Sequence, residues 1–152
     1  MTQQTEEQHH QNQRQNIEQE RGRWAWDDIG KIKGKGDTLE KEYRSLARGL
    51  NAMIQINGLG QTLGFLKAKG KGDANKAHFL LLKHLTEWMQ DHFKATNITV
   101  MKSGHDGLLQ WLMDEATSSA DYRRATTECL AFGVWLRRFA EAELKEPETG
   151  GE

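Results

Sequence analysis

The stretch that decides the fold is residues 39–65, LEKEYRSLARGLNAMIQINGLGQTLGF. From Leu39 to Ile54 apolar residues recur at steps of three and four, the spacing of one face of an amphipathic helix. The pattern breaks at Asn57-Gly58, a pair that supplies the positive φ of a helix C-terminus. Leucines at the same spacing resume at Leu59. The stretch therefore predicts two helices joined by a tight glycine junction.

The glycines of this junction also match parts of two nucleotide-binding motifs. A phosphate loop requires G-x-x-x-x-G-K-[ST], but Phe65 and Leu66 follow Gly64. A dinucleotide fingerprint requires a preceding strand, whereas the preceding period is helical. We therefore expect Gly60 and Gly64 to leave one helical face smooth for close packing, most simply by another helix of the same domain.

Helical spacing also extends outward from this stretch. It predicts further helices over residues 17–32, 79–93, 108–113 and 122–140, with a connection over residues 95–107. Two nearly identical heptapeptides, KIKGKGD at 31–37 and KAKGKGD at 67–73, each precede a helix. The flanking helices share too little for a true structural repeat.

The two ends of the chain are polar. Residues 1–16 carry five Gln in their first thirteen positions and predict a disordered extension, and residues 147–152, with the one proline and a Gly-Gly pair, predict a disordered tail. Between them, residues 17–146 predict one domain. The expected fold class is all-α, a single-domain helical bundle of about six helices with a disordered polar N-terminal extension.

Charge is unevenly distributed although the net charge is −1. Residues 21–83 carry 13 Lys or Arg against 6 Asp or Glu, and residues 84–152 carry 7 against 12. Such a division suits polyanion binding, head-to-tail association of identical subunits, or simply solubility. One cysteine, no signal peptide and no apolar run long enough to span a bilayer predict a cytoplasmic protein.

Catalytic and metal-binding patterns are weak. His84, Glu87 and Asp91 share a helix face beside His92, but a di-metal bundle needs Glu-x-x-His motifs on two helices, and the predicted helices from residue 17 onward contain no such motif. We expect His84 and His92 to be exposed and Cys129 to be a buried apolar residue. Ser103, His105 and Asp106 have no triad spacing. We therefore expect no metal, no cofactor and no enzyme activity.

Basic side chains are the better candidates for binding, because they can neutralise phosphates without reading sequence. For any one of them taken alone, a solvated surface charge is the better interpretation. The candidate nucleic-acid-binding residues are Arg44, Arg48, Lys67, Lys69, Lys71, Arg123, Arg124, Arg137 and Arg138.

Three segments together resemble a known family. YRSLARGLNAMIQINGLGQTLGFLKAKGKG (43–72), YRRATTECLAFGVWLRRFAEAEL (122–144) and WAWDDIGKI (24–32) are similar to the small helical subunit of the type III-B CRISPR RAMP-module effector, the Cmr complex. The resemblance covers roughly residues 21–145. Asn51 stands where the family often has proline, and the glutamine-rich extension is additional.

The resemblance implies a non-catalytic subunit that stacks head to tail as a minor filament. Its partners would be the repeated RAMP backbone subunits, the large polymerase-like subunit, the guide RNA and the target RNA. The basic face would line the RNA groove, and the copy number is left open. The alternative is a helical protein-interaction domain that docks an acidic partner without touching nucleic acid.

Overall fold

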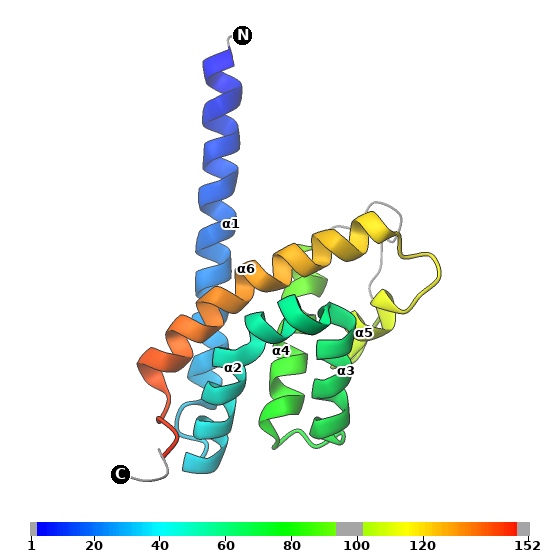
Figure 1. The fold of residues 1–152 in the computed structure, drawn as a ribbon. Helices are drawn as coiled ribbons and strands as arrows, with labels where there is room; N and C mark the ends of the chain where they lie inside the picture. Colours follow the sequence, from blue (N-terminus) through cyan, green and yellow to red (C-terminus); the bar gives the residue numbers. More distant parts are fainter. Residues whose placement is uncertain (1–2, 94–101, 149–152) are drawn as a thin grey trace.

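The computed structural model describes residues 3–93 and 102–148. These residues form helices and no strands, which confirms the expected all-α class (Figure 1). None of the described helices is long and apolar enough to cross a membrane. The helices are α1 (Gln3–Ile32), α2 (Asp37–Asn57), α3 (Leu59–Gly70), α4 (Ala77–His92), α5 (Gly107–Leu112) and α6 (Ser119–Glu143).

Helix α1 starts earlier than the apolar pattern does. Its backbone is helical from Gln3, whereas the sequence predicts a disordered extension over residues 1–16. This part of α1 projects beyond the rest of the molecule (Figure 1). Ile17 is the first described side chain of α1 that packs against the core. The boundary between extension and domain at residue 17 stays a prediction, as does the tail at 147–152, of which residues 149–152 lie outside the described part. Residues 95–101 of the predicted connection at 95–107 also lie outside the described part.

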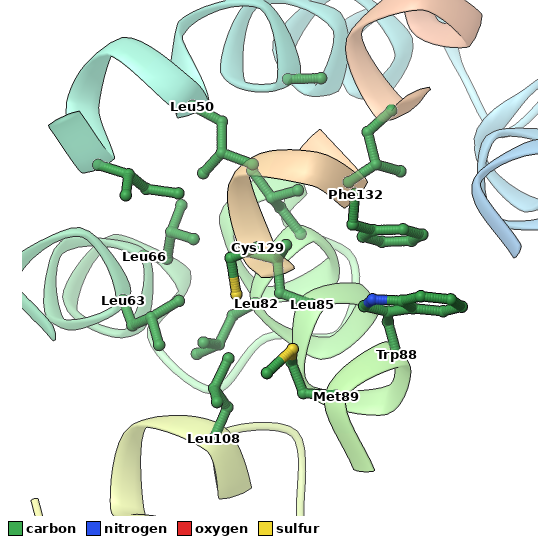
Figure 2. Close-up of a cluster of buried hydrophobic side chains, with 14 of the residues drawn as sticks. Leu50, Leu63, Leu66, Leu82, Leu85, Trp88, Met89, Leu108, Cys129 and Phe132 are labelled. Atoms are coloured by element: carbon green, nitrogen blue, oxygen red, sulfur yellow. The ribbon is translucent and has the colours of Figure 1, made fainter. Parts of the chain in front are cut away.

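The core is organised around α4, which packs against α2, α3, α5 and α6. Trp88 of α4 stacks on Phe132 of α6 with ring centroids 4.9 Å apart. Each fully buried large apolar side chain contributes about 1.5–3 kcal/mol to folding. The buried apolar side chains between these helices therefore hold the helices in this arrangement. Figure 2 labels Leu50, Leu63, Leu66, Leu82, Leu85, Trp88, Met89, Leu108, Cys129 and Phe132.

The α2–α3 junction is a packing junction, as the sequence predicts. Gly58 has φ +86° and its N–H donates to the Ile54 carbonyl at 2.8 Å. The Gly60 N–H donates to the Tyr122 hydroxyl of α6 at 2.8 Å, and a Cβ at Gly60 would lie 2.7 Å from that oxygen. The expectation for Gly64 is wrong, because a Cβ there would meet nothing within 4 Å.

Asn51, the position of the departure from the family pattern, joins α2 to α6. Its Nδ2 donates to the Leu130 carbonyl at 3.0 Å. Gly133 makes room for it, since a Cβ there would lie 2.1 Å from Asn51 Oδ1. Helix α2 continues through this position without a break.

His84 is buried, which corrects the expectation that it is exposed. It is 3% exposed and its Nδ1 lies 2.7 Å from the Tyr43 hydroxyl of α2. Its Nε2 lies 3.9 Å from the buried Asp28 carboxyl of α1. Burial, with the charges of Lys31 and Lys83, lowers the pKa of His84 to about 3, while burial raises the pKa of Asp28 to about 8. The α1–α2–α4 contact therefore encloses an uncharged polar group that apolar periodicity alone does not reveal.

Candidate nucleic-acid interface

The nine candidate residues do not form one surface. The structure divides eight of them among the α2–α6 face, the N-terminal end of α6, the α3–α5 contact and the C-terminal end of α3 with the loop after it. The ninth, Arg138, lies beside Trp135. They also differ in their interactions, because some form ion pairs with acidic side chains of the described residues and others do not.

Arg44, Arg48 and Arg137 gather around one acid where α2 lies along α6. The Arg137 Nε donates to Glu141 Oε1 at 2.7 Å and lowers the pKa of that carboxyl, and the charges of Arg48 and Arg44 lower it further. Arg44 Nε is buried and has no hydrogen-bond partner among the described residues. This α2–α6 arginine group thus has more positive than negative charge. The i, i+4 spacing of Arg44 and Arg48 predicted that they share a face, but not that Arg137 joins them.

Arg123 and Arg124 border a cavity of about 720 Å³ between α1, α4 and α6. Arg124 donates to Asp121 at 3.1 Å and lies 5.2 Å from the centre of the Phe93 ring. The third arginine of this cavity, Arg21, makes two 2.8 Å hydrogen bonds to Glu128. Acids therefore engage Arg21 and Arg124, and both Arg123 and Arg124 are exposed.

Lys67 joins two helices. Its Nζ donates to Asp106 Oδ2 at 2.5 Å, next to the start of α5, and this contact lowers the pKa of Asp106. Lys67 therefore links α3 to α5, and the negative charge of Asp106 weakens its attraction for an anionic ligand. Arg138 lies apart from the other eight, beside Trp135 and Val134 at a cavity of about 430 Å³.

Lys69 and Lys71 come together with the other lysine–glycine loop. They line a cavity of about 620 Å³ whose opposite wall includes Lys35 and Gly36 from the α1–α2 connection. The loops are 36 residues apart in sequence but lie at the same end of the molecule, the lower end in Figure 1. The near-identity of the two heptapeptides is the sequence signal that could have connected the two loops. The lysines of the first loop and Lys76 are not among the nine residues predicted from the sequence.

The residues considered for catalysis and metal binding do not assemble into a reactive site. Cys129 is fully buried, and burial, with the charge of Glu128, raises the pKa of its thiol. His84 contacts Tyr43. The His92 ring stacks on Trp88 with centroids 3.9 Å apart and its side chain is 18% exposed, which corrects the expectation that His92 is exposed as well. Within residues 3–93 and 102–148, no three His, Cys, Asp or Glu side chains gather closely enough to hold a metal ion.

Comparison with known proteins identifies what the chain is similar to. Residues 17–143 match the model of a family described as CRISPR-associated protein (Cas_Cmr5). A protein of Thermus thermophilus named CRISPR system Cmr subunit Cmr5 is 31% identical over 117 residues, which cover 75% of this chain and 82% of that protein.

A solved structure has the same fold. It is the X-ray crystal structure of a CRISPR-associated Cmr5 family protein, also from Thermus thermophilus. It aligns with a TM-score of 0.64 at 23% identity and covers 84% of this chain and 97% of that one. The alignment thus includes nearly all of the Thermus thermophilus structure and leaves a small part of this chain unaligned.

Proposed function

The chain belongs to the Cas_Cmr5 family of CRISPR-associated proteins, and from this premise we propose that it is a non-catalytic structural subunit that contacts RNA in its complex. Membership makes it a subunit of a Cmr complex, the type III-B CRISPR effector. The proposal adds three functions: it serves antiviral defence as part of an RNA-guided, RNA-targeting assembly, it stacks with its own copies as a minor filament, and it touches the backbone of the guide and target RNA. Its protein partners would be the repeated RAMP backbone subunits and the large polymerase-like subunit.

A non-catalytic role fits the state of the reactive side chains. A thiol with a raised pKa is protonated at neutral pH and is a poor nucleophile. A histidine with a pKa of about 3 is neutral there and, being buried, has no access to a substrate. We therefore assign target cleavage to other subunits.

The observation that carries RNA contact is the α2–α6 arginine group. Arg137 binds Glu141, and the charges of Arg48 and Arg44 also act on that one carboxylate, so the three positive charges are only partly balanced. Arginine and lysine contacts to phosphates give salt-sensitive affinity without base specificity. A subunit that accompanies many different guides needs this kind of contact.

Head-to-tail stacking requires two different surfaces on each copy. Two are present among the described residues. Ile56, at the end of α2, is 80% exposed, and Met113, near the same junction, is 62% exposed. Trp26 of α1 and Val134 of α6 are half exposed on a different part of the molecule, where Trp26 packs edge-on against Phe139. Scattered exposed apolar residues are common on monomers, and these two pairs are the surfaces that we propose for stacking.

The test of RNA contact is reversal of charge at Arg44 and Arg48 in a reconstituted complex. We expect R44E/R48E to weaken retention of target RNA while the subunit keeps its helical circular dichroism. R48E alone separates this loss from any effect of the partly buried Arg44. K41E/K102E, with the same charge change at two ion-paired lysines elsewhere, is the control. Unchanged retention at moderate salt would remove this pair from the interface.

The alternative of an acidic protein partner makes a different prediction. If the basic residues only dock protein, a complex that lacks this subunit will hold its target RNA as tightly as the complete complex. Loss of RNA on omission of the subunit, with the remaining subunits still assembled, favours the RNA contact.

A further inference from the structure

The two lysine–glycine loops together form one basic site. The cavity of about 620 Å³ between them is lined by Lys35, Lys69, Lys71 and Lys76. A second cavity, of about 390 Å³, shares Lys35 with the first and adds Lys31. The sequence contains two separate loops, and the fold turns them into one continuous surface, which we name the paired-loop site.

The lysines of this site, apart from Lys83, which lines the second cavity and pairs with Glu87, differ from those elsewhere in the described chain. Lys31, Lys35, Lys69, Lys71 and Lys76 all line the two cavities, and no ion pair to any of them is found within the described residues. Every other described lysine pairs with an acid, and these are Lys33, Lys41, Lys67, Lys83, Lys102 and Lys145. In a chain of net charge −1, the unpaired lysines are thus confined to one place.

The backbone at this site adds positive potential. Helices α2 and α4 both begin at the cavity, and neither N-terminus has a side-chain cap. The first N–H groups of a helix attract anions. Two carboxylates, those of Asp37 and Glu42, line the larger cavity beside its four lysines, and Asp37 already pairs with Lys145, so lysines outnumber acids there. The site therefore favours a ligand with several negative charges.

We propose that the paired-loop site binds the phosphodiester backbone of RNA. The proposal rests on the proposed RNA contact of the subunit and names a second place, besides the α2–α6 arginine group, where RNA is bound. It adds Lys31, Lys35 and Lys76, and it favours Lys69 and Lys71 over Lys67, which Asp106 holds. Successive phosphates of one strand would follow the row of lysines, and no base would be read.

The composition of the site favours RNA over an acidic protein segment. Protein interfaces are enriched in aromatic residues and depleted of lysine at their centre. None of the large apolar side chains that are well exposed in the described chain, Trp26, Ile56, Met113 and Val134, lines these cavities. Lysines on glycine loops can instead adjust to the spacing of phosphates.

The test compares two variants that remove the same charge. K35Q/K69Q/K71Q neutralises the site, and K33Q/K41Q/K102Q neutralises three ion-paired lysines outside it, one of them in the first loop itself. Each full-length subunit is assembled with guide RNA and the other Cmr subunits, and affinity for labelled target RNA is measured against salt. We expect the site variant to bind roughly tenfold more weakly at low salt and to flatten the slope of log K against log salt by about 2. The control variant should change neither appreciably.

Lysine acetylation, read by mass spectrometry, supplies a second measurement. We expect RNA to protect Lys35, Lys69, Lys71 and Lys76 in the wild-type complex and nuclease treatment to expose them. Equal affinity and slope in the two variants would overturn the site while leaving the subunit's role intact. Protection that survives nuclease, with the site variant excluded from the complex though folded, would assign the loops to a protein partner. A wild-type subunit that enters no RNA-containing assembly would remove the proposed function itself.

Discussion

The α2–α3 junction and the paired-loop site are both rich in glycine, but their glycines serve different purposes. At the junction, Gly60 lies against Tyr122, and a side chain there would collide with the hydroxyl. In the loops, Gly34, Gly36 and Gly72 have positive φ and open space where a Cβ would be. Gly60 is required because helices pack closely at the junction, where Gly58 instead turns the backbone at φ +86°. Gly34, Gly36 and Gly72 are required because the backbone turns in the loops, where Gly70 instead packs against Phe79. The first requirement concerns stability, and the second leaves lysines exposed for binding.

The largest effect should come from truncating the apolar side chain at the junction. Leu59 is fully buried. We expect Leu59→Ala to lower the free energy of unfolding by about 2–5 kcal/mol, because it leaves a cavity in the core. Urea unfolding followed by circular dichroism measures this. Lys69→Ala, on the same helix but exposed at the loop end, should change stability by no more than about 0.5 kcal/mol. Similar losses of unfolding free energy in both variants would contradict the distinction between a junction that stabilises the fold and a loop that does not.

A smaller effect is expected from filling the space at Gly60. Gly60→Ala should cost about 1–3 kcal/mol, because its Cβ would press on the Tyr122 hydroxyl. Tyr122→Phe should cost about 1 kcal/mol, since the Gly60 N–H loses its acceptor.

The double variant sharpens this result. Phenylalanine at position 122 removes the atom with which the new methyl group collides, so G60A/Y122F should be less destabilised than the sum of the two single variants. Strict additivity in the unfolding free energies would show that Gly60 is not selected by this contact.

The smallest effect is expected in the loops. Gly72 has φ +66° with nothing near its Cβ position, and asparagine tolerates that conformation better than most residues. Gly72→Asn should therefore change stability by less than about 1 kcal/mol. Gly60→Asn, by contrast, should be at least as harmful as Gly60→Ala. A severe loss at Gly72 would mean that the loop is packed as tightly as the junction.

Most of the fold could be predicted from sequence because local signals agreed with it. Apolar spacing located the helices, and the Asn57-Gly58 pair marked the α2–α3 boundary that the structure has. Long-range contacts could not be predicted in the same way. Nothing near Gly60 in sequence indicates Tyr122, and nothing near His84 indicates that Tyr43 and Asp28 bury it.

The candidate interface shows the same limit. The sequence identified basic residues by their abundance and spacing, but not by whether an acid already holds them. Lys67 and Arg124 met the sequence criteria and are ion-paired. Lys31 and Lys35 did not meet those criteria, yet Lys35 lines the same cavity as Lys69 and Lys71, and Lys31 lines the adjoining one. Only the packing of α1 and α2 beside α3 and α4 distinguishes these cases.

The most direct test of the central claim is native mass spectrometry of the tagged protein, purified from its own host without nuclease treatment. We predict a large assembly that contains several copies of this chain, the RAMP and polymerase-like subunits and a guide RNA. Such a result would also give the copy number. A bare monomer, or a small complex of protein alone, would contradict the account.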